Sequence, residues 1–390
     1  MNICMIGFYQ YPIPPISGGS LAIVAYELVK KFANKGYPVT VFSIKDPSLP
    51  SFEEKNGIRY FRINNPVYPR NSMIKQSISS LIYSLSISTK INSISNIDII
   101  QCFDPLMIPF MKGSVIKKRP ILLRFGMGFG LSKGWQLTRR PNWAFIKLAD
   151  QLIVPSSFLK KLVITNLGLS EEKVSVIPNG VNLDQFNPKI SGDEIRKKYD
   201  LGDSPVILFV GRINPEKGVD LLIDSIPFVQ KQIKDVKLLV VGPTTNELYL
   251  DQLKSLVSKF GLKNDVIFAG EKDVKHELPK FYAVCDVFCC PSNHGEGFGN
   301  VALEALASGK PVVSTSSGGL PEIIEENKVG FVVPVMNKEK LASALIQILE
   351  NVSLQKKMGY AARKRVEEFF SWENISTKYL NLYKEIVERN

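Results

Sequence analysis

The sequence predicts two α/β domains, each a doubly wound parallel sheet, that face each other across a cleft. A chain of 390 residues exceeds the size at which one hydrophobic core usually stops growing. Short apolar strands alternate with helical segments in two series, separated by a polar, proline-containing connection near residues 182–191. We therefore expect Rossmann-like domains at residues 1–187 and 188–370, and a C-terminal helix at 371–390 that crosses back to the first domain.

The first series begins with a β-α-β unit. Residues 3–8 read as an apolar strand, apolar residues then recur at helical spacing from Leu21 to Phe32, and Gly36 ends that helix before a strand at 39–44. Further strands are expected at 97–102, 121–125, 151–154 and 174–177.

Residues 72–95 carry apolar side chains on one helical face. Such a face is more often part of a core than of a membrane helix, so we expect it to be buried. Its members are Ile74, Ile78, Leu81, Ile82 and Leu85.

The second series contains six short apolar segments separated by helical ones. They lie at 206–210, 237–241, 266–269, 284–290, 311–314 and 330–333. In doubly wound domains, ligands bind at the carboxyl ends of the strands, so we expect the binding residues in the loops that follow them.

The net charge of +12 is concentrated in the first half of the chain, where residues 1–190 contain 23 Lys and Arg against 10 Asp and Glu. This asymmetry favours an anionic partner, either a membrane surface, a phosphorylated acceptor or nucleic acid. A solvated basic face is the alternative. No recognised nucleic-acid motif accompanies the charge, so nucleic acid is the least expected partner.

Five cysteines, an odd number without C-x-x-C spacing, fit structural thiols in a reducing compartment. No segment reaches the ~18 uninterrupted apolar residues of a membrane span. We expect a cytoplasmic protein, with peripheral association at the inner face of the cell membrane as a further expectation.

Two motifs follow strands of the second series. The loop at 211–218 carries Arg212 and Lys217, two cations suited to a diphosphate. The segment 291–304 contains Glu296, then Gly297 and Gly299, whose small size allows close backbone approach, and then a helix expected to begin near Phe298. The N–H groups and dipole of that helix favour a phosphate, and Glu304 lies further along it.

Residues 296–304 resemble the paired-glutamate motif of the retaining glycosyltransferases of family 4. The resemblance extends over nearly the whole chain, through the 211–218 loop, the Ile-Pro-Asn-Gly-Val segment at 177–181, Gly18-Gly19 and the Phe-Ser-Trp segment at 370–372. It implies a GT-B fold with a nucleotide-diphosphate sugar bound as donor substrate by the C-terminal domain, a glycan or lipid-linked acceptor, and no cofactor.

The resemblance also implies roles for individual residues. Glu304 would accept the ribose hydroxyls, Arg212 and Lys217 would neutralise the diphosphate leaving group, and Glu296 would contact the transferred sugar. Such fixed charges stabilise the transition state more than the ground state. Backbone groups near the phosphates would come from Gly18, Gly19, Gly297, Phe298 and Gly299.

One feature departs from the family pattern. Many members have a histidine near the end of an N-domain strand, facing the donor sugar, whereas this chain has no histidine before His276. Arg124, Phe125 or Gly126 would occupy that space, and we count Arg124 and Gly126 as substrate-binding candidates. The chain also lacks the D-x-D pair of metal-dependent GT-A enzymes, so no metal site is predicted.

Three alternatives remain open. A sugar-nucleotide epimerase of the same fold would bind the same nucleotide but transfer nothing. A glycosidase would use two carboxylates about 5 Å apart and would not require Arg212 and Lys217. A non-enzymatic basic protein would use its positive charge to bind a membrane or nucleic acid and would catalyse no reaction.

Overall fold

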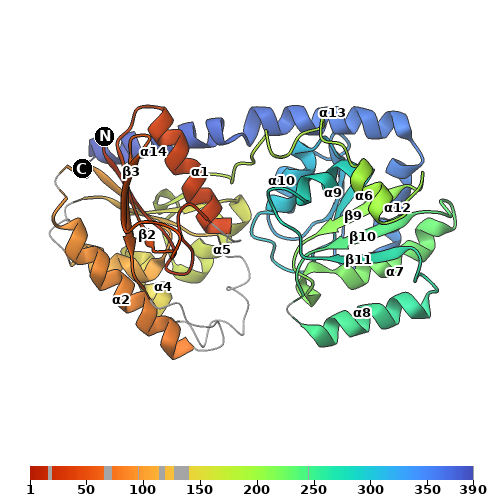
Figure 1. Ribbon diagram of the computed structural model, residues 1–390, viewed down its shortest axis with the longest axis horizontal. Helices are drawn as coiled ribbons and strands as arrows, with labels where there is room; N and C mark the ends of the chain where they lie inside the picture. Colours follow the sequence, from red (N-terminus) through yellow and green to blue (C-terminus); the bar gives the residue numbers. More distant parts are fainter. Residues whose placement is uncertain are drawn as a thin grey trace. The chain divides into compact units, whose positions relative to one another are not determined.

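The computed structural model describes residues 1–15, 20–65, 73–94, 96–113, 119–126, 140–244 and 246–389. The chain folds into two compact units. The first unit combines Met1–Asn179 with Trp372–Asn390, and the second unit is Gly180–Ser371 (Figure 1).

The first unit contains an eight-stranded sheet in the order β3-β4-β2-β1-β5-β6-β7-β8. Its strands are β1 (Ile3–Ile6), β2 (Val39–Ile44), β3 (Phe52–Lys55), β4 (Ile58–Ile63), β5 (Ile99–Cys102), β6 (Ile121–Arg124), β7 (Gln151–Val154) and β8 (Val174–Val176). All neighbours pair in parallel except β3 and β4. The strands expected in the first half are therefore confirmed.

The β3–β4 hairpin was not predicted. Its turn is Asn56-Gly57, and both residues have positive φ, 52° and 74°. Asn-Gly is the preferred sequence for a two-residue hairpin turn, so a signal for it was present in the sequence.

Helices cover both faces of this sheet. They are α1 (Ser20–Asn34), α2 (Met73–Ile91), α3 (Ile108–Lys112), α4 (Arg140–Leu148), α5 (Ser157–Leu167) and α14 (Trp372–Arg389). Side chains of α2 to α5 share one hydrophobic core with the sheet, and those of α1 and α14 share the core on its other face.

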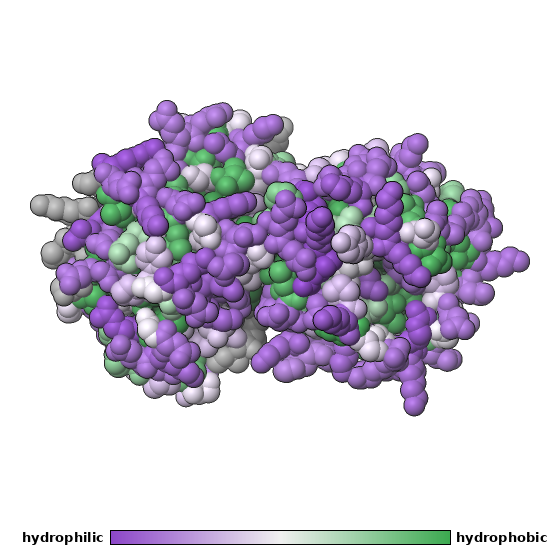
Figure 2. All heavy atoms as spheres, turned by 90° about the horizontal axis from the view of Figure 1, so that it is seen from above, coloured by the Kyte–Doolittle hydropathy of each residue, from purple (hydrophilic) through white to green (hydrophobic). Residues whose placement is uncertain are grey.

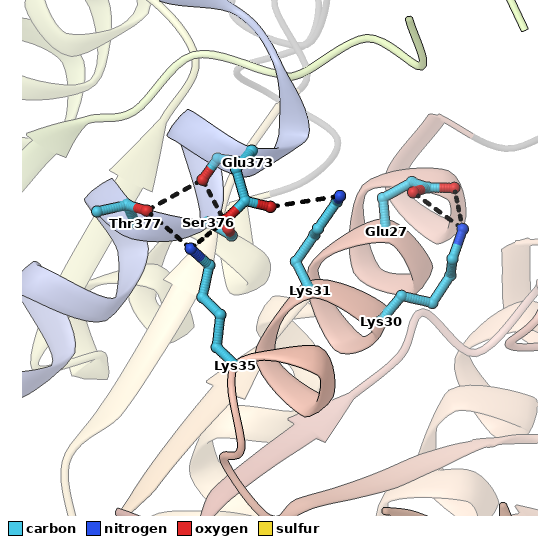
Figure 3. A network of polar contacts seen from close by, with 7 residues as sticks. All are labelled: Glu27, Lys30, Lys31, Lys35, Glu373, Ser376 and Thr377. Carbon is cyan, nitrogen blue, oxygen red and sulfur yellow. Dashed lines mark hydrogen bonds and ion pairs between the residues drawn. The ribbon is translucent and has the colours of Figure 1, made fainter. Parts of the chain in front are cut away.

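Helix α14 is tied to α1 by charge and by aromatic packing. Lys31 of α1 and Lys35, which directly follows α1, pair with Glu373 (Figure 3). The ammonium of Lys35 also donates to the Thr377 hydroxyl at 3.2 Å. The ring of Phe32 lies 5.7 Å from that of Tyr383. The C-terminal helix is thereby part of the first unit.

The expectation that the apolar face of α2 is buried is wrong for every member whose side chain is described. Ile78, Leu81, Ile82 and Leu85 are 46%, 45%, 39% and 50% exposed; the side chain of Ile74 lies outside the described residues. Serines and Tyr83 face the sheet instead. The Tyr83 hydroxyl lies within hydrogen-bonding distance of the carbonyl oxygens of Gly7 and Phe42, at 3.4 and 3.3 Å. Helix α2 therefore packs on the sheet through Tyr83, Ile87 and Ile91, which lie four residues apart on a different face from the predicted one.

The second unit contains a parallel six-stranded sheet in the order β11-β10-β9-β12-β13-β14. Its strands are β9 (Val206–Val210), β10 (Lys237–Val241), β11 (Val266–Gly270), β12 (Val287–Cys290), β13 (Val312–Thr315) and β14 (Gly330–Val333). The six predicted strands are confirmed, although the fourth starts at Val287 because α9 continues through Val284.

Two helical layers enclose this sheet. The helices are α6 (Asp193–Lys198), α7 (Val219–Gln230), α8 (Glu247–Lys259), α9 (Leu278–Val284), α10 (Asn300–Ala307), α11 (Leu320–Ile323), α12 (Lys338–Leu349) and α13 (Val352–Phe369). α7, α8 and α12 pack on one face, and α9, α10, α11 and α13 pack on the other.

All five cysteines are buried and free, as expected for structural thiols. Burial raises the pKa of the Cys290 thiol to about 12. Among the described residues, no helix combines the length and apolarity needed to cross a membrane.

Each sheet has one point at which the strand order reverses. In the first unit the chain runs from β1 outward to β3 and β4 and then resumes at β5 on the other side of β1. In the second unit the reversal lies between β9 and β12. Open α/β sheets bind ligands at the carboxyl ends of strands at such a switch point.

Candidate functional site

Three loops converge at the switch point of the second unit. They follow β9, β12 and β13 and span residues 211–218, 291–299 and 316–319. The amide of Asn293 donates to the carbonyl of Glu216 at 2.9 Å, and the amide of Gly319 donates to the carbonyl of Glu296 at 2.8 Å. The middle loop is therefore held by its neighbours on both sides.

Two glycines make this close approach possible. Gly218 and Gly318 have φ of +69° and +61°. A Cβ at Gly218 would overlap the carbonyl oxygen of Pro291, and one at Gly318 would overlap that of Glu296. Both positions need glycine for its conformation and for its size.

The loops bring Lys217 and Glu296 into direct contact. Their side chains form an ion pair although they are 79 residues apart in sequence. Only 15% of the Lys217 side chain and 12% of the Glu296 side chain is exposed. A largely buried pair gains little net stability, because desolvation offsets most of the attraction. Its position at the switch point suggests a role in binding.

Arg212 begins the same loop and is exposed. The carboxyl end of β9 therefore carries two cations, one paired with a carboxylate inside the loop cluster and one facing solvent. Such a pair suits an anionic ligand with two charged groups, such as a diphosphate.

Helix α10 starts at Asn300, two residues later than expected, because Gly299 adopts φ +107° and serves as its N-cap. The Phe298 ring is buried, 6.2 Å from the ring of Phe370. The predicted contribution of Gly297, Phe298 and Gly299 concerns their backbone groups and stays a prediction.

Glu304 lies on α10, half-buried. Its carboxylate accepts a hydrogen bond from the Tyr282 hydroxyl at 2.8 Å. Burial raises the pKa of Glu304 to about 7, and the bond from Tyr282 opposes this shift. Near neutral pH the group therefore exchanges a proton readily.

The candidates in the first unit lie elsewhere. Gly18 and Gly19 fall outside the described residues. Gly126 follows β6, where an added Cβ would lie 3.4 Å from Leu21. Arg124 is 1% exposed, and its guanidinium donates to the carbonyl of Ile177 at 2.7 Å and to the side chain of Asn179. Its role as a sugar contact stays a prediction.

Sequence reasoning overlooked several polar groups at the strand ends. Around the β9–β12 switch, Asn214 Oδ1, Asn293 Oδ1 and Ser317 Oγ are buried without a hydrogen-bond partner among the described residues. Buried polar atoms are normally paired, so unpaired ones at these strand ends mark a candidate binding site. Their position directly after strands was the signal that could have identified them.

A similar group lies at the switch point of the first unit. Asp104 follows β5, is 1% exposed, and has one carboxylate oxygen without a partner in the described part of the chain. Burial raises its pKa to about 7, opposed by the hydrogen bond from the Leu106 amide.

An uncharacterized glycosyltransferase of Methanocaldococcus jannaschii is 30% identical over 400 residues, covering 100% of this chain and 99% of that protein. The model of Glycosyltransferase Family 4 matches residues 18–185, and that of glycosyl transferases group 1 matches 191–365. This chain belongs to glycosyltransferase family 4. The chain is thus a nucleotide-sugar-dependent glycosyltransferase.

Solved structures agree with this assignment at the level of fold. The sucrose-phosphate synthase of Thermosynechococcus elongatus has a TM-score of 0.81 at 24% identity, covering 100% of both chains. The Anabaena protein HepE, in complex with UDP and glucose, has a TM-score of 0.75 at 22% identity, covering 98% of this chain and 99% of its own. This chain therefore has the predicted GT-B fold.

Proposed function

We propose that this glycosyltransferase moves a hexose from a nucleotide-diphosphate sugar to a hydroxyl of a glycan, lipid-linked or small-molecule acceptor, with retention of anomeric configuration and without a metal. The observation that carries the proposal is the Lys217–Glu296 pair at the β9–β12 switch, with Arg212 on the same loop. Two cations and a carboxylate at one strand end support a sugar diphosphate as ligand, because it has a charged leaving group and hydroxyls that a carboxylate can bind.

Relatives make the donor and acceptor classes concrete. A Mycobacterium tuberculosis protein that is 34% identical over 209 residues, 52% of this chain, is a GDP-mannose-dependent mannosyltransferase acting on a phosphatidylinositol monomannoside. HepE has been solved with UDP-glucose. Both donors are nucleotide-diphosphate hexoses, which supports a hexosyl donor here.

The reaction requires charge stabilisation at the diphosphate. When the anomeric C–O bond breaks, its electron pair goes to the diphosphate and the sugar acquires oxocarbenium character. Lys217 would shift from Glu296 toward the diphosphate as the donor binds, and Arg212 would join it. Glu296 would then accept hydrogen bonds from the sugar hydroxyls, and Glu304 would hold the ribose. Once the donor is bound, these charges would already be in place, so they would lower the barrier without further reorganisation during the reaction.

Lys217→Ala tests the leaving-group role. We expect kcat to fall about 100-fold or more, because a preorganised charge on the leaving group is lost. Lys254→Ala is the matched control, since Lys254 is an exposed lysine of α8 in the same unit. Turnover of Lys217→Ala at the level of Lys254→Ala would contradict the assignment.

The assay needs a donor, which can be chosen by screening nucleotide sugars for thermal stabilisation. NMR of the product then reports the anomeric configuration, with an α-linkage expected from an α-linked donor. Addition of EDTA should leave the rate unchanged, because side-chain cations take the place of a metal. An altered donor sugar without transfer would indicate an epimerase, and an EDTA-sensitive rate would contradict metal independence.

A further inference from the structure

The outer face of α2 forms an apolar stripe on the first unit. Ile78, Leu81, Ile82 and Leu85, here called the α2 stripe, follow the i, i+3, i+4, i+7 spacing of a single helical face. Between 39% and 50% of each side chain is exposed. Figure 1 shows α2 along the outside of the first unit.

The inner face of α2 explains why the stripe points outward. Ser79, Ser80, Tyr83 and Ser84 are 1% exposed or less. The hydroxyl of Ser84 donates to the carbonyl of Ser80 at 2.6 Å, and Tyr83 contacts the sheet backbone. Further along the helix, Ile87 and Ile91 are buried in the core of the first unit. Helix α2 thus has two apolar faces, and the one that contains the stripe is exposed.

The helices beside α2 are basic. α3 packs against both α2 and α4, and α5 shares their hydrophobic core. In sequence, α2 to α5 contain seven Lys or Arg and no Asp or Glu. Lys90, Lys147 and Lys161 of this layer are exposed. Leu148, at the end of α4, adds a further apolar side chain that is 46% exposed.

The helices on the other face of the same sheet differ. α1 and α14 together carry five Lys or Arg and four Asp or Glu. Their side is seen from above in Figure 2, where it is mostly hydrophilic with small separate apolar patches. The excess of positive charge and the continuous stripe therefore coincide on one helical layer.

We propose that the layer formed by α2 to α5 docks the first unit on an anionic lipid bilayer. The α2 stripe enters the boundary between headgroups and acyl chains, while Lys90, Lys147 and Lys161 face the acidic headgroups. An amphipathic helix with apolar and cationic side chains binds an interface through both contributions.

Other occupants fit less well. A second copy of the chain would bring two basic layers together, and like charges repel. Nucleic acid could pair its phosphates with the lysines, but it would offer no apolar surface to cover the α2 stripe. A bilayer of acidic lipid supplies both.

Vesicle sedimentation tests this surface. The full chain is mixed with vesicles of phosphatidylcholine containing phosphatidylglycerol, and the bound fraction is measured at rising salt. We expect binding to anionic vesicles that weakens with salt, and the double variant Leu81→Ser/Leu85→Ser to bind at least about tenfold more weakly. Leu248→Ser is the matched control, because Leu248 is a 78% exposed leucine of α8 in the second unit.

Each remaining outcome is decisive. Equal binding of wild type and the double variant, absence of wild-type binding, or equal binding to pure phosphatidylcholine would overturn the proposal. The proposal would also be overturned if analytical ultracentrifugation showed that wild type is a dimer and the double variant a monomer. Unfolding midpoints of the variants should match wild type, since both leucines are exposed. Turnover with soluble substrates should be unchanged in the double variant, which separates this test from that of the proposed function.

Discussion

We expect Glu304 to couple donor recognition to pH through its proposed contact with the ribose. Its carboxylate is half-buried beside Tyr282, and burial raises its pKa to about 7. Only the ionised form can accept hydrogen bonds from two ribose hydroxyls while it keeps the bond from Tyr282. Because the pKa lies above that of the unfolded chain, the folded state is stabilised relative to the unfolded state below about pH 4.5, and this contribution is lost as the pH rises through 7.

We expect the affinity for nucleoside diphosphate to rise as the pH is raised through 7. Below the pKa of Glu304, the increase should approach about tenfold per pH unit. Glu304→Gln, which cannot ionise, should bind more weakly at pH 8 and show a smaller pH dependence. Calorimetric titration at several pH values measures this. Titration of the ligand's own phosphates affects wild type and Glu304→Gln equally. Identical pH profiles of the two proteins would therefore contradict a contact between Glu304 and the ribose.

The loop after β9 illustrates how an element positions the site. Gly218 lets this loop close against Pro291, and that contact places Lys217 beside Glu296. Gly261, after α8, has a similar φ of +72° but no atom within 4 Å of its added Cβ. The two glycines thus share a left-handed conformation and differ in how closely another part of the chain approaches them.

Gly261→Ala should destabilise the second unit by about 1 kcal/mol, the usual cost of a left-handed alanine. Gly218→Ala should cost several kcal/mol, because the loop must also move away from Pro291. Thermal unfolding with and without nucleoside diphosphate measures both effects, and ligand stabilisation should be lost only in Gly218→Ala. Equal losses in the two variants would show that the close approach is unimportant.

The strands that flank the site were predictable because each is a short apolar run followed by a glycine-containing or polar loop. The contact between Lys217 and Glu296 was expected only as convergence on a common ligand; it depends on β9 and β12 being neighbours, which strand order decides. The orientation of α2 was predicted wrongly, because the helix has a second apolar face, formed by Tyr83, Ile87 and Ile91, and that face packs on the sheet. Asp104 was missed although it follows β5, because the sequence does not show that its carboxylate is buried.

At the scale of the whole molecule, the first unit is completed by the C-terminal helix. The chain leaves this unit after Asn179 and returns to it at Trp372. Arg124 binds the residues just before the departure, Ile177 and Asn179, and its guanidinium lies 6.0 Å from the ring centre of Tyr379 on α14. The buried side chain of Arg124 thus contacts both the segment where the chain leaves the first unit and the helix with which it returns.

Arg124→Lys should lower the stability of the first unit by about 2–4 kcal/mol, because lysine cannot make both hydrogen bonds and leaves buried acceptors unpaired. Arg59→Lys is the matched control, since Arg59 makes a part-buried hydrogen bond to Thr40 at 3.0 Å. Thermal unfolding and donor KM are both measured. An unchanged midpoint with a raised KM would instead support the predicted sugar contact.

We expect the loops after β9, β12 and β13 to hold the nucleotide-diphosphate sugar. A crystal structure of the full chain with the nucleoside diphosphate that stabilises it most would test this directly. We predict the diphosphate beside Lys217 and Arg212 at the start of α10, with the ribose on Glu304. A diphosphate bound elsewhere in the chain, with the Lys217–Glu296 pair undisturbed, would contradict it.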